Sequence, residues 1–154
     1  MKMIVAAVTL FILACAPARG DDRADRKTAE RVFLEKMGKG RFDRLDELYD
    51  PAFTAHAAGK AYTLAEDNMS GREWRKAFPD LRVTVSHSLA RDGLAAVHWR
   101  AVGTNSVPAA GLPGTGGHMD IDGMTFFRMK GGRIIEEWSV IDIATLQSQM
   151  RGVE

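Results

Sequence analysis

An acidic residue follows the last predicted strand, residues 133–141, and its position suits proton-transfer chemistry. Period-two alternation puts one set of side chains on a single face: Ile134, Glu136, Trp138, Val140 and Asp142. That face carries the larger apolar load, so we expect it to point inward. A carboxylate at its inner end would be partly desolvated, which raises its pKa and favours general acid/base catalysis by Asp142.

A second interpretation of Asp142 is structural. It directly precedes a predicted helix over residues 143–150, and aspartate is a favoured N-cap because its carboxylate accepts hydrogen bonds from the first helical N–H groups. The residues alone favour this capping role over catalysis, and both interpretations stay open.

The four histidines offer little support for a metal site, because no two are four residues apart on one helix and no H-E-x-x-H motif occurs. His56 is the one we expect to point into a cavity formed with the helices. His87 and His98 are predicted cross-strand neighbours. His118 shares a face with the two aspartates that follow it at alternate positions, which is a weak cation-site pattern. A lone histidine is more often a structural residue.

Other chemistries lack the residues they need. No G-x-S-x-G motif marks a nucleophilic serine. Glu136 and Asp142 would lie roughly 20 Å apart along one strand, too far for a glycosidase carboxylate pair. No glycine-rich nucleotide-binding motif is present.

Composition fits one folded domain. The chain has 154 residues, of which 45% are hydrophobic and 27% charged. Lys and Arg number 21 against 20 Asp and Glu, so the charge balance gives no reason to expect a nucleic-acid or anionic-membrane partner. The single cysteine excludes a disulfide framework and a cysteine-rich metal site.

Residues 1–20 have the pattern of an export signal: Lys2, an apolar run over residues 3–14 that is too short to span a membrane, and small residues near the end. Cys15 lies in a context that looks like a bacterial lipobox. Three kinds of processing are expected, in this order: cleavage of the signal with release of a soluble domain, attachment of a lipid at Cys15, and retention of the uncleaved signal as an anchor. We therefore predict one domain over residues 21–154, periplasmic or secreted in a bacterium, with membrane contact only through the signal or a lipid.

The remaining pattern predicts helices first and strands later. The predicted segments are helices over 28–37, 42–49, 63–78 and 143–150, and strands over 52–56, 81–86, 94–102, 118–129 and 133–141. Turn signals occur at Asp92-Gly93 and Gly131-Gly132, and Gly123 is a possible bulge. This order favours an α+β fold, with N-terminal helices packed on one face of a strongly curved antiparallel sheet.

Four ordered stretches resemble the SnoaL-like polyketide cyclase (ester cyclase) family, a branch of the nuclear-transport-factor-two-like fold. They are residues 37–53 followed by His56, residues 77–83, the loop glycines and prolines of residues 103–116, and residues 131–138 followed by Asp142. The resemblance covers roughly residues 28–150. It implies a cone-shaped domain around one deep apolar pocket.

The resemblance also implies chemistry. Family cyclases close a ring by intramolecular aldol condensation without metal or cofactor, and their acid/base aspartate lies near the end of the closing strand. Asp142 matches that position, which shifts the balance toward a catalytic role, and His56 matches a pocket hydrogen-bonding group. The expected pocket walls are Trp138, Trp99, Phe53, Trp74, Phe78, Phe127 and Val140.

Three functional hypotheses follow. The first is an enzyme that uses Asp142 on a small apolar carbonyl compound. The second is a non-catalytic exported module that binds a small apolar molecule in the same pocket, and the third and weaker one is a hydratase or epoxide-opening enzyme. The resemblance further implies a homodimer, for which the outer face of the closing strand, with Ile135 and Ile141, is the expected surface.

Overall fold

The structure is a computed structural model, which describes residues 21–151. The predicted export signal over residues 1–20, with Cys15, lies outside the described residues. In the part of the chain that is described, no helix is both long and apolar enough to cross a membrane.

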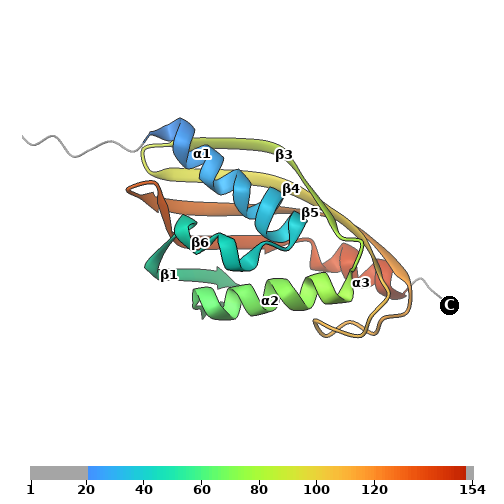
Figure 1. Ribbon diagram of the computed structural model, residues 1–154. Coiled ribbons are helices and arrows are strands. Elements are labelled where there is room, and N and C mark those ends of the chain that lie inside the picture. Colours follow the sequence, from blue (N-terminus) through green and yellow to red (C-terminus); the bar gives the residue numbers. More distant parts are fainter. Residues whose placement is uncertain (1–20, 152–154) are drawn as a thin grey trace, which may run out of the picture.

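Over residues 21–151, three α-helices and several short helical turns accompany six strands (Figure 1). In chain order they are α1 (Asp22–Arg31), the π-helix η1 (Val32–Met37), the 3-10 turns η2 (Phe42–Arg44) and η3 (Asp46–Leu48), β1 (Tyr49–Ala57), β2 (Lys60–Tyr62), α2 (Leu64–Ala77), β3 (Arg82–Arg91), β4 (Leu94–Asn105), β5 (Gly117–Lys130), β6 (Arg133–Ile141) and α3 (Ile143–Arg151). The predicted α+β class is confirmed.

The six strands form one sheet in the order β2-β1-β6-β5-β4-β3. Neighbouring strands are antiparallel, as predicted, except β1 and β6, which run parallel and make the sheet mixed. Because β1 and β6 are far apart in the chain, no local sequence pattern predicts that they pair or in which direction they run. Figure 1 shows α1 and α2 on one face of the sheet, and α3 at the end toward which the long strands bend.

Local signals explain where the helices begin. Asp21 caps α1, since its carboxylate accepts hydrogen bonds from the N–H groups of Arg23 and Ala24 at 2.9 and 3.2 Å. Thr63 and Glu66 form a reciprocal capping box at the start of α2. The helix predicted over residues 63–78 therefore agrees with α2 to within a residue at each end.

The π-helix η1 continues α1 toward the centre of the molecule. Its wider turn is visible at the end, where the Gly38 N–H donates to the Phe33 carbonyl five residues earlier. Val32, Phe33 and Lys36 are all buried on this element. Short π-helical segments are rare and frequently occur at functional sites.

The two tight hairpin turns lie where the sequence predicts them. Asp92 and Gly93 both have positive φ angles, 51° and 78°, and connect β3 to β4. Gly131 and Gly132 do the same between β5 and β6. Gly123 is not a bulge, because its pairing with Trp99 continues the regular β4–β5 register.

A β-bulge lies instead in β6, at Ile135. Arg128 pairs with Glu136 and the next residue of β5, Met129, pairs with Ile134, so Ile135 is the extra residue. The bulge reverses the alternation, and Glu137 follows Ile134 on the buried side. The predicted inner face, which ran from Glu136 to Asp142, is therefore wrong.

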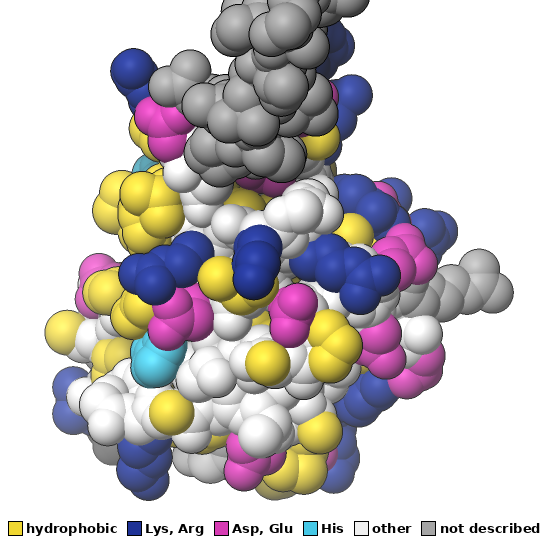
Figure 2. Space-filling view, turned by 90° about the vertical axis from the view of Figure 1, so that its left-hand side faces the viewer, with side chains coloured by type: hydrophobic (Ala, Val, Ile, Leu, Met, Phe, Trp, Pro, Cys, Tyr) yellow, Lys and Arg dark blue, Asp and Glu magenta, His cyan; other side chains and the backbone are white. Residues whose placement is uncertain are grey.

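Charged side chains of both signs are interspersed on the molecular surface. In the view of Figure 2, Lys and Arg groups lie beside Asp and Glu groups, with hydrophobic side chains between them. This mixed face agrees with the near-neutral charge balance of the sequence.

The close approach of α2 to the turn η2 yields a stability prediction. A Cβ atom on Gly71 would lie 2.5 Å from Phe42 Cε1 and 3.1 Å from Met37 Sδ. Gly71→Ala gains about 1 kcal/mol of helix propensity, but overpacking against the buried Phe42 ring costs about 1–3 kcal/mol. We expect a net loss in the free energy of unfolding, measured by urea denaturation. Met69→Ala, at an exposed position of the same helix, is the control and should change it by under about 0.5 kcal/mol; a G71A protein as stable as wild type would contradict the prediction.

Candidate active site

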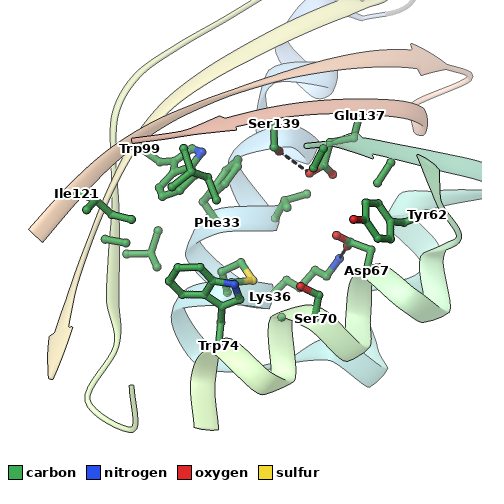
Figure 3. Close-up of a pocket in the computed structure, with 18 of the residues that line it drawn as sticks. Phe33, Lys36, Tyr62, Asp67, Ser70, Trp74, Trp99, Ile121, Glu137 and Ser139 are labelled. Atoms are coloured by element: carbon green, nitrogen blue, oxygen red, sulfur yellow. Dashed lines mark hydrogen bonds and ion pairs between the residues drawn. The ribbon is translucent and has the colours of Figure 1, made fainter. Parts of the chain in front are cut away.

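A cavity of about 330 Å³ lies between the helices and the sheet. Its lining is mostly apolar, with polar groups gathered at one end. Figure 3 shows Glu137, Tyr62 and Asp67 at that end and Trp74, Trp99 and Ile121 at the other. The cavity therefore suits a compact ligand with an apolar body and a polar head.

Aromatic rings build the apolar end. Trp99 from β4 stacks on Phe33 from η1, with ring centroids 5.3 Å apart, and both line the cavity. Trp74 from α2 lines the opposite wall and stacks on Phe78 at 5.6 Å. The structure places two of the predicted wall residues, Trp99 and Trp74, in the lining.

Glu137 is the central polar group of the cavity. Its side chain is only 8% exposed, and its Oε1 accepts a hydrogen bond from Ser139 Oγ at 2.9 Å. Its other oxygen, Oε2, is buried and has no hydrogen-bond partner within residues 21–151. A buried carboxyl oxygen without a partner is costly and is characteristic of functional sites.

An ion pair between a buried lysine and a partly exposed aspartate forms part of the cavity lining. Lys36 Nζ lies 2.5 Å from Asp67 Oδ2 and also donates to the Tyr49 hydroxyl at 3.1 Å. Lys36 is 2% exposed, so its charge is sustained by these two partners. Burial raises the pKa of the Tyr49 phenol well above its ordinary value, so this hydroxyl stays neutral.

The electrostatics of the cavity keep Glu137 near its midpoint of ionisation. Burial and, to a smaller extent, the Asp67 carboxylate raise its pKa, Lys36 and the Ser139 hydrogen bond lower it, and the net result is a pKa of about 7. Near neutral pH both the acid and the base form are therefore populated, which is what proton transfer in both directions requires.

Asp142 occupies a different environment from the one predicted for it. It is exposed and caps α3, accepting from the Thr145 N–H at 2.9 Å and the Thr145 hydroxyl at 2.7 Å. These hydrogen bonds hold the pKa of Asp142 below its usual range. The expected burial and raised pKa are wrong, because the bulge at Ile135 and the start of α3 turn this carboxylate to the surface.

His56 borders the cavity, but its ring turns away from it. The imidazole stacks on Trp138, with centroids 5.1 Å apart, and its Nε2 lies 3.5 Å from Glu136 Oε1. Trp138 and Glu136 alternate with the cavity residues Glu137 and Ser139, so this cluster lies on the outer face of the sheet. The expected role of His56 as a pocket hydrogen-bonding group is not supported by this geometry.

Five other predicted wall residues do not line the cavity. Trp138 and Val140 lie on the outer face, where Val140 is 71% exposed, for the same reason of reversed alternation. Phe53, Phe78 and Phe127 are buried in the core behind the lining, where they pack on Tyr49, Trp74 and Phe33 respectively.

The other histidines lie outside the cavity. His87 and His98 are paired across β3 and β4 as predicted, with their Nδ1 atoms 3.4 Å apart. Asp120, in the predicted trio with His118, is held instead by Arg100. Over residues 21–151, no group of three or more His, Cys, Asp or Glu side chains is arranged to hold a metal ion.

The family model of the SnoaL-like polyketide cyclases matches residues 27–150, which is nearly all of the described chain. This chain is a member of the SnoaL-like polyketide cyclase family. No curated protein matches it at a significant level.

Solved structures agree with the SnoaL-like assignment at the level of the fold. A candidate SnoaL-like polyketide cyclase from Jannaschia sp. CCS1 is 19% identical, with 89% of this chain and 99% of that chain covered and a TM-score of 0.76. IdmH from Streptomyces antibioticus, a candidate polyketide cyclase, is 24% identical over 82% and 97% of the two chains, with a TM-score of 0.71. AclR from Streptomyces galilaeus, a candidate hydroxylase, is 21% identical over 82% and 96% of the two chains, with a TM-score of 0.72. Neighbours with different names share this fold, so the chemistry must be argued from the side chains.

The sequence pattern alone does not predict the polar residues of this SnoaL-like cavity. Uninterrupted alternation along residues 133–141 places Glu137 and Ser139 on the outer face. Lys36 did carry a signal, because it occupies a position of the apolar helical stripe that includes Val32 and Phe33. A charged residue in such a stripe is either paired or functional. Asp67 offered no comparable signal.

The raised pKa of Glu137 predicts a pH-dependent stability. Between about pH 4 and 7, the folded protein holds a proton on Glu137 that the unfolded chain, with a glutamate pKa near 4.3, has released. The contribution of this protonation to the free energy of unfolding is therefore fully present below about pH 4 and is lost as pH rises through about 7. Relative to Glu137→Gln, wild type should lose about 1 kcal/mol of unfolding free energy per pH unit between about pH 5 and 7. Urea denaturation at several pH values measures this difference, and parallel pH profiles for the two proteins would contradict it.

Proposed function

We propose that this SnoaL-like protein uses Glu137 as a cofactor-free general acid/base on a small apolar carbonyl compound held in the cavity. The observation that carries the proposal is the buried Glu137 carboxyl, whose Oε2 has no partner within residues 21–151 and which borders a mostly apolar cavity. Asp142 does not support the same role, since it is exposed and occupied in capping α3.

The proposed reaction begins with the ionised form of Glu137. Its Oε2 takes a proton from a carbon next to a carbonyl, which leaves a neutral carboxyl and an enolate. In a ring closure, the enolate carbon attacks a second carbonyl of the same molecule, and the new alkoxide takes the proton back from Oε2. The buried ammonium of Lys36 would favour the negative charge that moves through these steps.

Deuterium exchange tests the first step without knowledge of the natural substrate. We expect wild type to accelerate the exchange of the α-protons of 2-tetralone, a ring-bearing ketone, in deuterated buffer, followed by proton NMR. Glu137→Gln removes the base and should lower the acceleration by about 10²-fold or more. Asp142→Asn is the matched control, because asparagine also caps helices, and should stay within about twofold of wild type.

The outcomes of this test separate the hypotheses. Equal exchange by wild type and E137Q would overturn the role of Glu137, and loss of exchange in D142N would restore Asp142 as the acid/base. Absence of exchange in wild type, together with an unmodified apolar ligand retained in native mass spectrometry, would instead favour the non-catalytic binding module.

We also propose that the protein is a homodimer that pairs through the outer face of β5 and β6. Ile141 lines the cavity, so the surface expected around Ile135 and Ile141 shifts to their neighbours. Met124 pairs with Val140, and Phe126 pairs with Trp138, on that face. Met124, Phe126 and Val140 are 63%, 41% and 71% exposed, and a contiguous exposed apolar patch of this kind favours an interface.

Light scattering coupled to gel filtration tests the dimer. Wild type should elute with twice the mass of one chain at tens of micromolar, and the double variant Met124→Glu/Val140→Glu should be monomeric, because it would bury like charges across the interface. Met69→Glu, at an exposed position of α2, is the control and should remain dimeric. A monomeric wild type at this concentration would contradict the proposal.

A further inference from the structure

A chain of hydrogen bonds joins Glu137 to the indole of Trp99 across three neighbouring strands. Trp99 Nε1 on β4 donates to Thr125 Oγ1 on β5 at 3.1 Å. Thr125 Oγ1 lies 2.9 Å from Ser139 Oγ on β6, and Ser139 donates to Glu137 Oε1 at 2.9 Å. Thr125 and Ser139 are directly paired in the β5–β6 register, so the backbone holds the two hydroxyls opposite each other.

Gly123 makes the first link possible. It pairs with Trp99 in the β4–β5 register, and a Cβ atom at this position would lie 2.2 Å from Trp99 Cζ2. The glycine therefore lets the indole ring lie flat across β5. From there its N–H reaches Thr125, two residues along the strand.

Trp99, at the end of the chain opposite Glu137, fixes the direction of the hydrogen bonds. An indole N–H can only donate, so Thr125 must accept from Trp99. Its own hydroxyl proton then needs an acceptor, because Thr125 is 1% exposed, and within the described residues Ser139 Oγ is the acceptor in reach. Ser139 has one proton, which is left to donate to Glu137 Oε1.

This direction holds for both forms of Glu137. If the neutral carboxyl carried its proton on Oε1 and donated to Ser139, the Ser139 hydroxyl would lose its acceptor on Glu137. Its proton would then point either to Thr125, whose buried hydroxyl would have two donors and no acceptor, or into the cavity that Ser139 lines. The arrangement that gives every hydroxyl of the chain an acceptor within the described residues therefore has Oε1 as an acceptor, and the proton of the neutral form resides on Oε2.

We propose that Trp99, Thr125 and Ser139 form a one-way hydrogen-bond chain that makes Oε2 the atom through which Glu137 exchanges a proton with a ligand in the cavity. The three are positioning residues, and the proposal rests on Glu137 being the acid/base of the proposed function. A ligand must then place its acidic carbon or its carbonyl oxygen against Oε2. The other titratable groups around Glu137 are Lys36 from η1, Asp67 from α2, Tyr49 from β1 and Tyr62 from β2.

Nuclear magnetic resonance tests the chain on the unliganded protein. Glutamate labelled with ¹³C at the side-chain carboxyl reports the titration of Glu137, and E137Q identifies its signal. The indole N–H signals report the tryptophans, and Trp99→Phe identifies that of Trp99. In wild type, we expect the Trp99 indole signal to shift with the midpoint of Glu137, since each hydroxyl polarises the next.

Substitutions then separate the chain from simple packing. Thr125→Val keeps the shape of the side chain and should abolish the coupled shift at Trp99. Ser139→Ala should raise the midpoint of Glu137 by about one pH unit, because it removes the hydrogen bond that favours the ionised form. Thr125→Ser keeps the hydroxyl and should retain both the coupled shift at Trp99 and the wild-type midpoint of Glu137. Thr84→Val, on an exposed part of β3, should also leave the shift and the midpoint unchanged.

A Trp99 signal that stays constant while wild-type Glu137 titrates would overturn the chain, and so would a T125V protein in which the coupled shift persists. These results need no substrate. Coupling without any ketone exchange would uphold the chain and count against the proposed function, whereas exchange that depends on Glu137 without coupling would do the reverse.

Discussion

One extra residue in β6, the bulge at Ile135, determines which side chains of the closing strand reach the cavity. Before it, Ile134 is buried; after it, Glu137, Ser139 and Ile141 take the inner side. Without the bulge the same strand would present Glu136, Trp138 and Val140. A single-residue change of register exchanges the whole set, since the side-chain period of a strand is two.

Glu137 on the inner side of β6 leaves the mostly apolar cavity with more acidic than basic side chains. Two carboxylates, Glu137 and Asp67, share the cavity with one ammonium group, that of Lys36. Lys36 and Asp67 form an ion pair with each other at 2.5 Å. An ionised Glu137 would therefore have no positively charged side chain of its own in the cavity lining. Such a group relieves the cost of burial by holding a proton, which is why its pKa approaches 7 while that of exposed Asp142 falls.

The sequence predicts the elements that local chemistry controls. Caps at Asp21 and Thr63, and turns at Asp92-Gly93 and Gly131-Gly132, have signatures within a few residues, and the fold class follows from their order. The parallel pairing of β1 with β6 and the bulge at Ile135 depend on contacts between distant segments. Simple alternation therefore places Glu137 on the wrong face, whereas the capping role of Asp142 follows from the helix pattern directly after it.

A single carboxyl can serve both halves of a proton transfer only when its two forms are close in free energy. A carboxylate such as Asp142, stabilised by the Thr145 N–H, is committed to the base form at neutral pH and has no proton to return. In the proposed reaction, Glu137 accepts a proton from carbon and gives it to an alkoxide from one atom, because Ser139 occupies its other oxygen. The fold supplies the cavity, and the sheet register of this chain places in it the buried carboxyl on which the proposed function depends.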